Sequence, residues 1–404
     1  MWWIIVLAVI GYAIMHAKRN LRMPGGARDA LLYITGLLQG LRTTIISGDL
    51  DKAKWVLQHG GSDKGRVIEE NMMLDVWVDA CSIESCNGQL WRDVRRSFDA
   101  FSHQLPSVDV LEEICLGWAP PGDGSKLLLD SPTFTKLTLQ CFGQWLFNED
   151  FQPRHLAALN SDSWEIRFEV AMRGHGDDQL KRAGNQAMID LLTGSSYSLP
   201  ASVPSWSERT AFSAVLQPFF ISPSVNFIDI VIAMDSLCDL RLVGPQWIAQ
   251  GFADAKPEIV AYICETMRLK HPFPVLERRL NDDQYFINLD TFFSETDPEF
   301  RPTKWVELQE SHPANFLLFG VGPRKCPGRH IAFACLPAMV YRCLELSLEN
   351  DPSMAAWQPA MNHRFSGRTL DNAPTPTSEA WHVTKRIARC LYNLAFERRN
   401  QLYT

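Results

Sequence analysis

The ten residues FGVGPRKCPG, at positions 319–328, decide how the rest of this chain is interpreted. They hold one cysteine, Cys326, among three glycines, with Arg324 two positions before it. Glycine has no Cβ, so the backbone can turn sharply here and lie close against a bound group. A cysteine binds a metal ion as a thiolate, and a buried thiol ionises only where positive charge compensates it. The stretch therefore predicts a loop in which Cys326 ligates a metal ion.

The same stretch matches F-x-x-G-x-R-x-C-x-G at every fixed position, and in this it resembles the haem-binding signature of the cytochrome P450 superfamily. The resemblance implies a haem b cofactor with Cys326 as the axial thiolate ligand of its iron. Phe319 is then expected beneath the porphyrin ring, and Arg324 at a propionate. The haem contacts expected from this loop are Phe319, Gly320, Gly322, Arg324 and Gly328.

Two segments upstream of the loop resemble structural landmarks of the family. The run ETMR at 265–268 fits E-x-x-R, and residues at i and i+3 share a helix face, so Glu265 can pair with Arg268. The segment 298–305 resembles F-x-P-x-R-[FW], but Lys304 stands where the family has arginine. Because lysine lacks the forked geometry of a guanidinium, we expect a weaker network in which Arg301 could substitute.

A third landmark is the run WRDVR at 91–95, which matches the family's W-x-x-x-R. A spacing of four puts Trp91 and Arg95 on one side of a helix, where an indole N–H and a guanidinium could both reach haem propionates. The alternative is a basic helix at the surface, because Arg92, Arg95 and Arg96 are clustered here.

The resemblance also implies an acid and an alcohol on a long helix above the iron, where they deliver protons to oxygen. The closest match is Asp235-Ser236, within the apolar run 227–240. Met234 stands where the family has glycine, and serine replaces threonine. We predict that Asp235 and Ser236 form this relay. The alternative is that the aspartates of this run form the polar stripe of an amphipathic helix.

The chain begins with an apolar, uncharged stretch that basic residues follow. As a helix, residues 1–17 would extend about 26 Å, slightly less than the ~30 Å hydrocarbon core of a bilayer. We expect a membrane anchor at 1–17 and a basic hinge with proline and glycine at 18–28. The catalytic domain is then expected at 29–404.

Basic residues directly after the span would keep this domain in the cytoplasm, and the resemblance implies the endoplasmic reticulum membrane. A cleaved signal peptide is the alternative, because small residues at 11–13 have the right spacing, but the stretch lacks a basic start.

Composition narrows the possible partners. The chain has 404 residues, 46% of them hydrophobic, and a net charge of −7, which argues against a nucleic-acid partner. Ten cysteines occur without C-x-x-C pairs, so neither a disulfide framework nor a zinc site is indicated. Cys81 and Cys86 are the only close pair, and a structural or incidental role is favoured for them.

Helical periodicity dominates the chain, and 45–57 is expected as a strand followed by a helix. The predicted fold is mainly α with small β-sheets: a cytochrome P450 fold, as a single haem-containing domain behind an N-terminal transmembrane helix.

The resemblance implies a monooxygenase that inserts one oxygen atom from dioxygen into a small apolar molecule. Electrons would come from an NADPH-dependent cytochrome P450 reductase, since the sequence has no flavin or dinucleotide fingerprint. The chain looks most like fungal members that act on terpenoid, polyketide or alkaloid intermediates of secondary metabolism. Two alternatives remain: a haem-thiolate isomerase, dehydratase or cyclase that needs no dioxygen, and a degenerate, non-catalytic haem protein.

Overall fold

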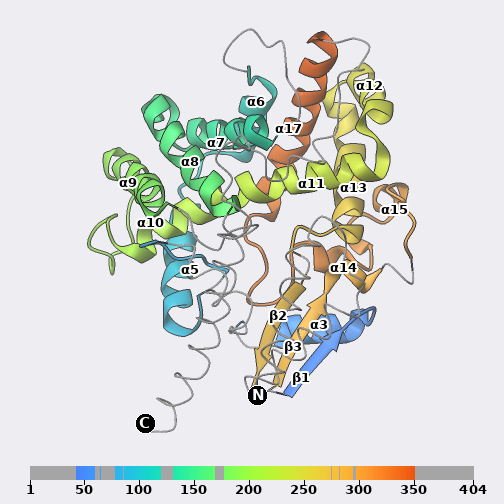
Figure 1. The fold of residues 1–404 in the computed structure, drawn as a ribbon, viewed down its shortest axis with the longest axis horizontal. Helices are drawn as coiled ribbons and strands as arrows, with labels where there is room; N and C mark the ends of the chain where they lie inside the picture. The colour runs from blue at the N-terminus through green and yellow to red at the C-terminus, as the bar shows by residue number, and fades with distance from the viewer. Residues whose placement is uncertain are drawn as a thin grey trace, which may run out of the picture.

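The computed structural model describes residues 42–59, 64, 78–84, 86–119, 131–168, 177–273, 275–281, 283–293 and 297–350. The expected anchor at 1–17 and hinge at 18–28 lie outside these residues. Within them the chain is mainly helical with one small sheet (Figure 1), as the sequence predicted. The expected strand and helix at 45–57 are confirmed as β1 and α3.

The helices of the described residues lie between Leu50 and Asn350. Their bounds are α3 Leu50–His59, α5 Gly88–Ser102, α6 Val108–Leu116, α7 Ser131–Phe147, α8 Pro153–Phe168, α9 Asp178–Gly194, α10 Arg209–Val215, α11 Ser222–Cys238, α12 Leu240–Gln250, α13 Phe252–Leu269, α14 Leu289–Phe292, α15 Thr303–Leu308, α16 Asn315–Leu318 and α17 Arg329–Asn350.

The strands β1 (Arg42–Ile46), β2 (Val275–Leu280) and β3 (Asp283–Asn288) form a sheet in the order β1-β3-β2. β1 pairs with β3 in parallel, from Arg42 opposite Asp283, and β2 pairs with β3 antiparallel. A small core of apolar side chains joins the sheet to α3, including Ile46, Leu57 and Ile287. The sheet and α3 thus form a separate corner of the fold, below the helices in Figure 1.

A helix of 30 residues, Arg209–Cys238, crosses the middle of the molecule as α10, a π-helical segment and α11 (Figure 1). The π-helical segment, Leu216–Ile221, contains Pro218, which cannot donate a backbone hydrogen bond. Phe219 of this segment packs against Phe98 and Phe101 of α5, with ring centroids 5.8 and 5.7 Å apart. The aromatic contacts therefore join the long helix to α5 at its irregular turn.

In the described part, Arg209–Cys238 and Arg329–Leu348 are long and apolar enough to cross a membrane. The protein buries 67% of the most apolar window of the first helix and 61% of that of the second. The buried core helices of other proteins can be equally long and apolar, so length and composition identify neither helix as a membrane span.

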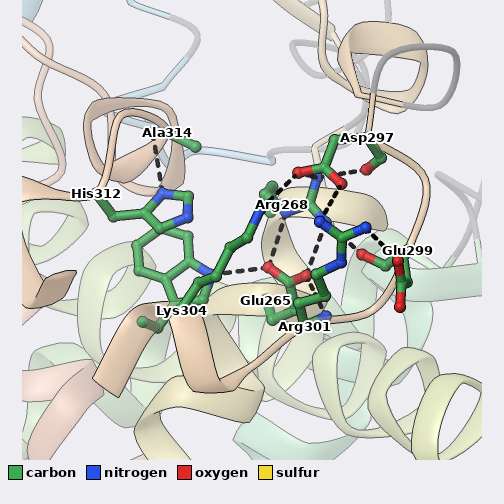
Figure 2. Close-up of polar contacts among 9 residues, drawn as sticks. Glu265, Arg268, Asp297, Glu299, Arg301, Lys304, His312 and Ala314 are labelled. Carbon is green, nitrogen blue, oxygen red and sulfur yellow. Dashed lines mark hydrogen bonds and ion pairs between the residues drawn. The ribbon is translucent and has the colours of Figure 1, made fainter. Parts of the chain in front are cut away.

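The carboxylate of Glu265, which is 1% exposed, accepts four hydrogen bonds (Figure 2). Arg268 donates two through Nε and Nη2, each 2.7 Å long, as the E-x-x-R spacing predicted. The backbone N–H of Arg301 donates at 2.6 Å, and the indole N–H of Trp305 at 2.8 Å. Burial raises the pKa of Glu265, but these donors outweigh burial and the pKa is lowered.

Lys304 does not reach this carboxylate. Its ammonium lies 3.3 Å from Asp297, and the Arg301 side chain pairs with Asp297 and Glu299 (Figure 2). Arg301 contributes to the network in place of the missing arginine, which the sequence had suggested. It does so with its backbone N–H and not with its guanidinium. Trp305 supplies the remaining donor, and its ring stacks on His312 with centroids 3.8 Å apart.

The network predicts unequal effects on stability. Glu265→Gln leaves the buried Arg268 with the more distant carboxylate of Asp297, 4.0 Å from its Nη1, as its charged partner, so we expect the free energy of unfolding to fall by about 3–5 kcal/mol. Lys304→Ala, the matched control, removes an ion pair whose lysine is 40% exposed, and we expect a loss of less than about 1 kcal/mol. Urea unfolding followed by tryptophan fluorescence measures both, and equal losses would contradict the assignment.

Candidate functional site

The Cys326 loop connects α16 to α17 and is closed by its own backbone. The N–H of Cys326 donates to the carbonyl oxygen of Phe319 at 2.7 Å, and the N–H of Lys325 donates to that of Gly322 at 3.1 Å. Gly320 and Gly322 have φ of +69° and +80°, in the left-handed region that favours glycine. The structure therefore confirms that the glycines allow this loop to turn.

Gly322 also fixes the loop against the sheet corner. A Cβ at this position would collide with the carbonyl oxygen of Leu57, near the end of α3. Gly320 has no such neighbour, because the nearest atom to its Cβ position is 3.8 Å away. The two glycines thus have different roles: both permit the turn, and only Gly322 permits the close approach.

The Cys326 side chain is exposed to solvent, and the protein around it still has a strong effect on its thiol. The protein atoms around the sulfur desolvate the thiolate and raise the pKa of Cys326 to about 11, the charge of Glu84 adds to the rise, and the charges of Arg95 and Lys64 oppose it. At Gly328 a Cβ would lie 3.9 Å from the sulfur, at ordinary van der Waals distance. The loop therefore presents a protonated thiol that is accessible to a ligand.

Arg324 does not point into solvent from this loop. It donates to the carbonyl oxygens of Ile83 at 3.2 Å and Cys86 at 2.9 Å, and to Oδ1 of Asn87 at 3.0 Å. Its guanidinium lies over the ring of Trp91, 4.3 Å from the centroid. The structure thus joins two predicted haem contacts, Arg324 and Trp91. Their contact with haem remains a prediction.

Trp91 and Arg95 lie on α5, so the helix predicted for W-x-x-x-R is confirmed. The Nε of Arg95 donates to Asp99 at 2.9 Å, and the guanidinium lies 5.7 Å from the ring centroid of Phe98. The charge of Arg95 lowers the pKa of Cys326, so the guanidinium lies close enough to influence the sulfur. The structure therefore brings α5 and the cysteine loop together, as the sequence predicted.

Phe319 turns toward α17, where its ring meets that of Phe333 edge-on with centroids 5.1 Å apart. It is partly buried and packs against the main hydrophobic core.

Asp235 and Ser236 lie near the end of α11, not at its middle. The carboxylate of Asp235 accepts from the backbone N–H of Leu240 at 3.0 Å, and the carbonyl oxygen of Asp235 accepts from Asp239 N–H at 2.9 Å. The hydroxyl of Ser236 donates to Ala233 O at 2.7 Å and accepts from the Lys270 ammonium. Asp235 thus contacts the chain where α11 ends, whereas Ser236 contacts α11 itself and Lys270.

Sequence inspection missed a polar group nearer the middle of the long helix. The side-chain amide of Asn226 donates to the Ser222 hydroxyl at 2.9 Å, directly after the π-helical segment. Gln217, inside that segment, is 5% exposed, and its amide oxygen has no hydrogen bond among the described residues. The i, i+4 spacing of Ser222 and Asn226 is visible in the sequence, but the π-helical turn that adjoins it is not.

No group of three or more histidine, cysteine, aspartate or glutamate side chains in the described part of the chain could hold a metal ion. An accessible cysteine sulfur, with the charge of Arg95 on the neighbouring helix, fits the haem iron that the sequence resemblance implies.

No family model matches this sequence. One curated protein, described as probable cytochrome P450 CYP44 from Caenorhabditis elegans, is 46% identical over 44 residues, which is 11% of this chain and 9% of that protein.

Solved structures give a wider match. A six-coordinated cytochrome P450 from Thermus thermophilus aligns with a TM-score of 0.53 at 18% identity, over 74% of this chain and 83% of that one. A zebrafish cytochrome P450 with progesterone aligns at 0.52 and 15% identity, over 75% of this chain and 86% of its own. A cyanobacterial protein, CYP120A1 with bound retinoic acid, aligns with a TM-score of 0.51 at 13% identity, over 76% of this chain and 82% of that one. The described chain therefore has the cytochrome P450 fold.

The two loop glycines offer a matched test of the geometry at Cys326. Gly320→Ala adds a strained φ without a collision and should cost about 1 kcal/mol in the free energy of unfolding. Gly322→Ala adds the collision with Leu57, so we expect a larger loss, about 2–4 kcal/mol. Thermal unfolding of the two variants checks this order, and a smaller loss for Gly322→Ala would show that the loop does not depend on α3.

Proposed function

We propose that this chain is a haem-thiolate monooxygenase of the cytochrome P450 type, with Cys326 as the axial ligand of a haem b iron. The observation that carries the proposal is the Cys326 loop itself. It holds an accessible cysteine between α16 and α17, beside α5, in a chain with the cytochrome P450 fold. Because the curated sequence match spans 9% of its relative, the activity rests on the site and the fold.

Haem with a thiolate ligand would supply dioxygen activation, since the thiolate donates electron density that favours O–O cleavage. The residues of this chain would bind and orient it. Cys326 would hold the iron, and Trp91, Arg95 and Arg324 are the candidates for the propionates. The high pKa of the Cys326 thiol means that ligation releases a proton, which the charge of the metal makes favourable.

The substrate we propose is a small apolar molecule. The related structures contain apolar ligands, progesterone in the zebrafish protein and retinoic acid in the cyanobacterial one. Electrons would come from an NADPH-dependent cytochrome P450 reductase. A single-pass anchor at 1–17 would hold the catalytic domain on the cytoplasmic side of the endoplasmic reticulum membrane, and a role in fungal secondary metabolism is consistent with that arrangement. These finer assignments rest on the sequence resemblance.

One observation favours a second candidate, a haem-thiolate isomerase, dehydratase or cyclase that needs no dioxygen. Asp235 and Ser236, the predicted proton relay, are engaged in terminating α11 and in contacting Lys270. An enzyme without oxygen chemistry would not need these groups above the iron.

Oxygen uptake by the wild type with NADPH and a reductase separates the two candidates, and Asp235→Asn tests the relay. Asparagine keeps an oxygen that can accept from Leu240 N–H, so the helix end is preserved while the acid is lost. If Asp235 delivers protons, oxygen uptake driven by NADPH and a reductase should fall by about a hundredfold or more. Asp229→Asn, on the same helix, is the control. Uptake equal to wild type would remove Asp235 from the relay.

The ligand assignment is tested by the carbon monoxide difference spectrum of the reduced protein. We expect a Soret band at the position of thiolate-ligated haem. Cys326→His should move that band to the position of histidine-ligated haem, or abolish haem binding. A wild-type spectrum of the histidine type, or a thiolate-type band retained in the variant, would exclude Cys326 as the ligand.

A further inference from the structure

The turn before α5 holds two cysteines that the proposed haem site does not use. Cys81 and Cys86 are free thiols, 2% and 4% exposed. The thiol of Cys86 lies within hydrogen-bonding reach of two acceptors, the sulfur of Cys81 and the carbonyl oxygen of Ser82, which is 2.7 Å away. The sequence favoured a structural or incidental role for this pair. Because the two thiols are in contact, a two-electron oxidation could join them as a disulfide.

The surroundings of Cys81 differ from those of Cys86. The backbone N–H of Cys81 donates to the Ser213 hydroxyl at 2.8 Å, and the Arg209 guanidinium donates twice to the preceding carbonyl oxygen, at Ala80. The hydrogen bond from Cys86 lowers the pKa of Cys81, and the Arg209 charge assists against burial. The same hydrogen bond, with burial, raises the pKa of Cys86. The Arg209 guanidinium, which reaches Cys81, favours the thiolate at that position, and Cys86 lies where it can attack the oxidation product of Cys81.

The turn that separates the two cysteines also carries the acceptors of Arg324. They are the carbonyl oxygens of Ile83 and Cys86 and Oδ1 of Asn87, at 3.2, 2.9 and 3.0 Å. The backbone N–H of Cys86 donates to Ser82 O at 3.1 Å and so closes this turn. A bond between the two sulfurs would draw the Cys86 side chain away from Ser82 and displace the residue whose carbonyl holds Arg324.

We propose that Cys81 and Cys86 are a site of reversible oxidation, at which a peroxide converts the two thiols into a disulfide that reshapes the turn holding Arg324. The chemical step stands without haem, whereas its effect on the Cys326 loop as a haem site rests on the proposed function. The proposal assigns a modification site to residues outside the proposed catalytic machinery.

The step balances with hydrogen peroxide as the oxidant. The Cys81 thiolate attacks one peroxide oxygen, the O–O bond breaks, and hydroxide leaves and takes up a proton, which gives a sulfenic acid and water. The Cys86 sulfur then attacks the sulfenic sulfur, the S–O bond breaks, and the thiol proton leaves with the hydroxyl as a second water. Overall, two thiols lose two electrons, and one peroxide is reduced to two waters. A dithiol reductant reverses the change by thiol–disulfide exchange.

Mass spectrometry tests the chemical step directly. Both cysteines fall in one tryptic peptide, 67–92, because no lysine or arginine lies between its ends. After treatment of the intact protein with hydrogen peroxide and alkylation of the remaining thiols, this peptide should be lighter than its reduced form by two hydrogens and unalkylated. Dithiothreitol should restore two alkylated thiols.

The chain contains its own control pair. Cys115 and Cys141 are also in contact and are 0% exposed, but burial raises the pKa of Cys115 well above that of an ordinary thiol. This pair should stay reduced at peroxide concentrations that oxidise Cys81. Alkylation of both cysteines of peptide 67–92 after peroxide treatment, or oxidation of the Cys115 pair first, would overturn the proposal.

Haem release tests the link to Arg324. Loss of one hydrogen bond from Arg324 should speed transfer of haem to apomyoglobin by about two- to tenfold in the oxidised wild type. Dithiothreitol should reverse the change. The change should also be absent in Cys81→Ser and in Cys86→Ser, and two variants are used so that the test still works if one of them does not fold. A disulfide that forms without a change in haem release would overturn the coupling. A wild-type protein that binds no haem would instead contradict the proposed function, and the disulfide found in peptide 67–92 would be unaffected by that result.

Discussion

The buried carboxylate of Glu265 is the contact on which the region around Cys326 depends. A carboxylate loses much of its hydration when it is 1% exposed, and here four donors replace the water. They come from α13, from the segment that leads into α15 and from α15 itself, and the chain then continues through α16 into the Cys326 loop. Because donors from both parts of the chain meet at one carboxylate, Glu265 holds the chain that leads toward Cys326 against α13.

The sequence predicted the local parts of this arrangement well and the long-range parts poorly. Glu265 and Arg268 are three residues apart on one helix, so their contact follows from helical geometry. The remaining donors could not be predicted in the same way. A family pattern names side chains, and with Lys304 in the arginine position it indicated a weakened network. The structure fills the gap with the Arg301 backbone N–H and the Trp305 indole. Every residue except proline carries a backbone donor, so no pattern of side chains reveals which one is used.

The same limit applies at the candidate site. The glycines and Cys326 were predicted because a tight turn imposes residue types within a few positions. Arg324 was assigned to a propionate, yet its acceptors in this structure are distant in the chain, at Ile83, Cys86 and Asn87. Asp235 was chosen because it lies in an apolar run next to a hydroxyl. Sequence did not show that α11 ends three residues later, at Cys238, where the Asp235 carboxylate accepts from Leu240 N–H.

Two cysteines at this end of the molecule show how surroundings assign chemistry to one residue type. At Cys326 desolvation by the surrounding protein and the charge of the nearby Glu84 raise the pKa to about 11, so a free thiolate is disfavoured near neutral pH and a bound cation is needed to stabilise it. At Cys81 the Cys86 hydrogen bond and Arg209 supply that stabilisation from the protein, and the pKa is lowered. The accessible cysteine is therefore suited to be a metal ligand, and the buried one to react. Arg324 connects the two, because it belongs to the loop of the first and binds the turn of the second.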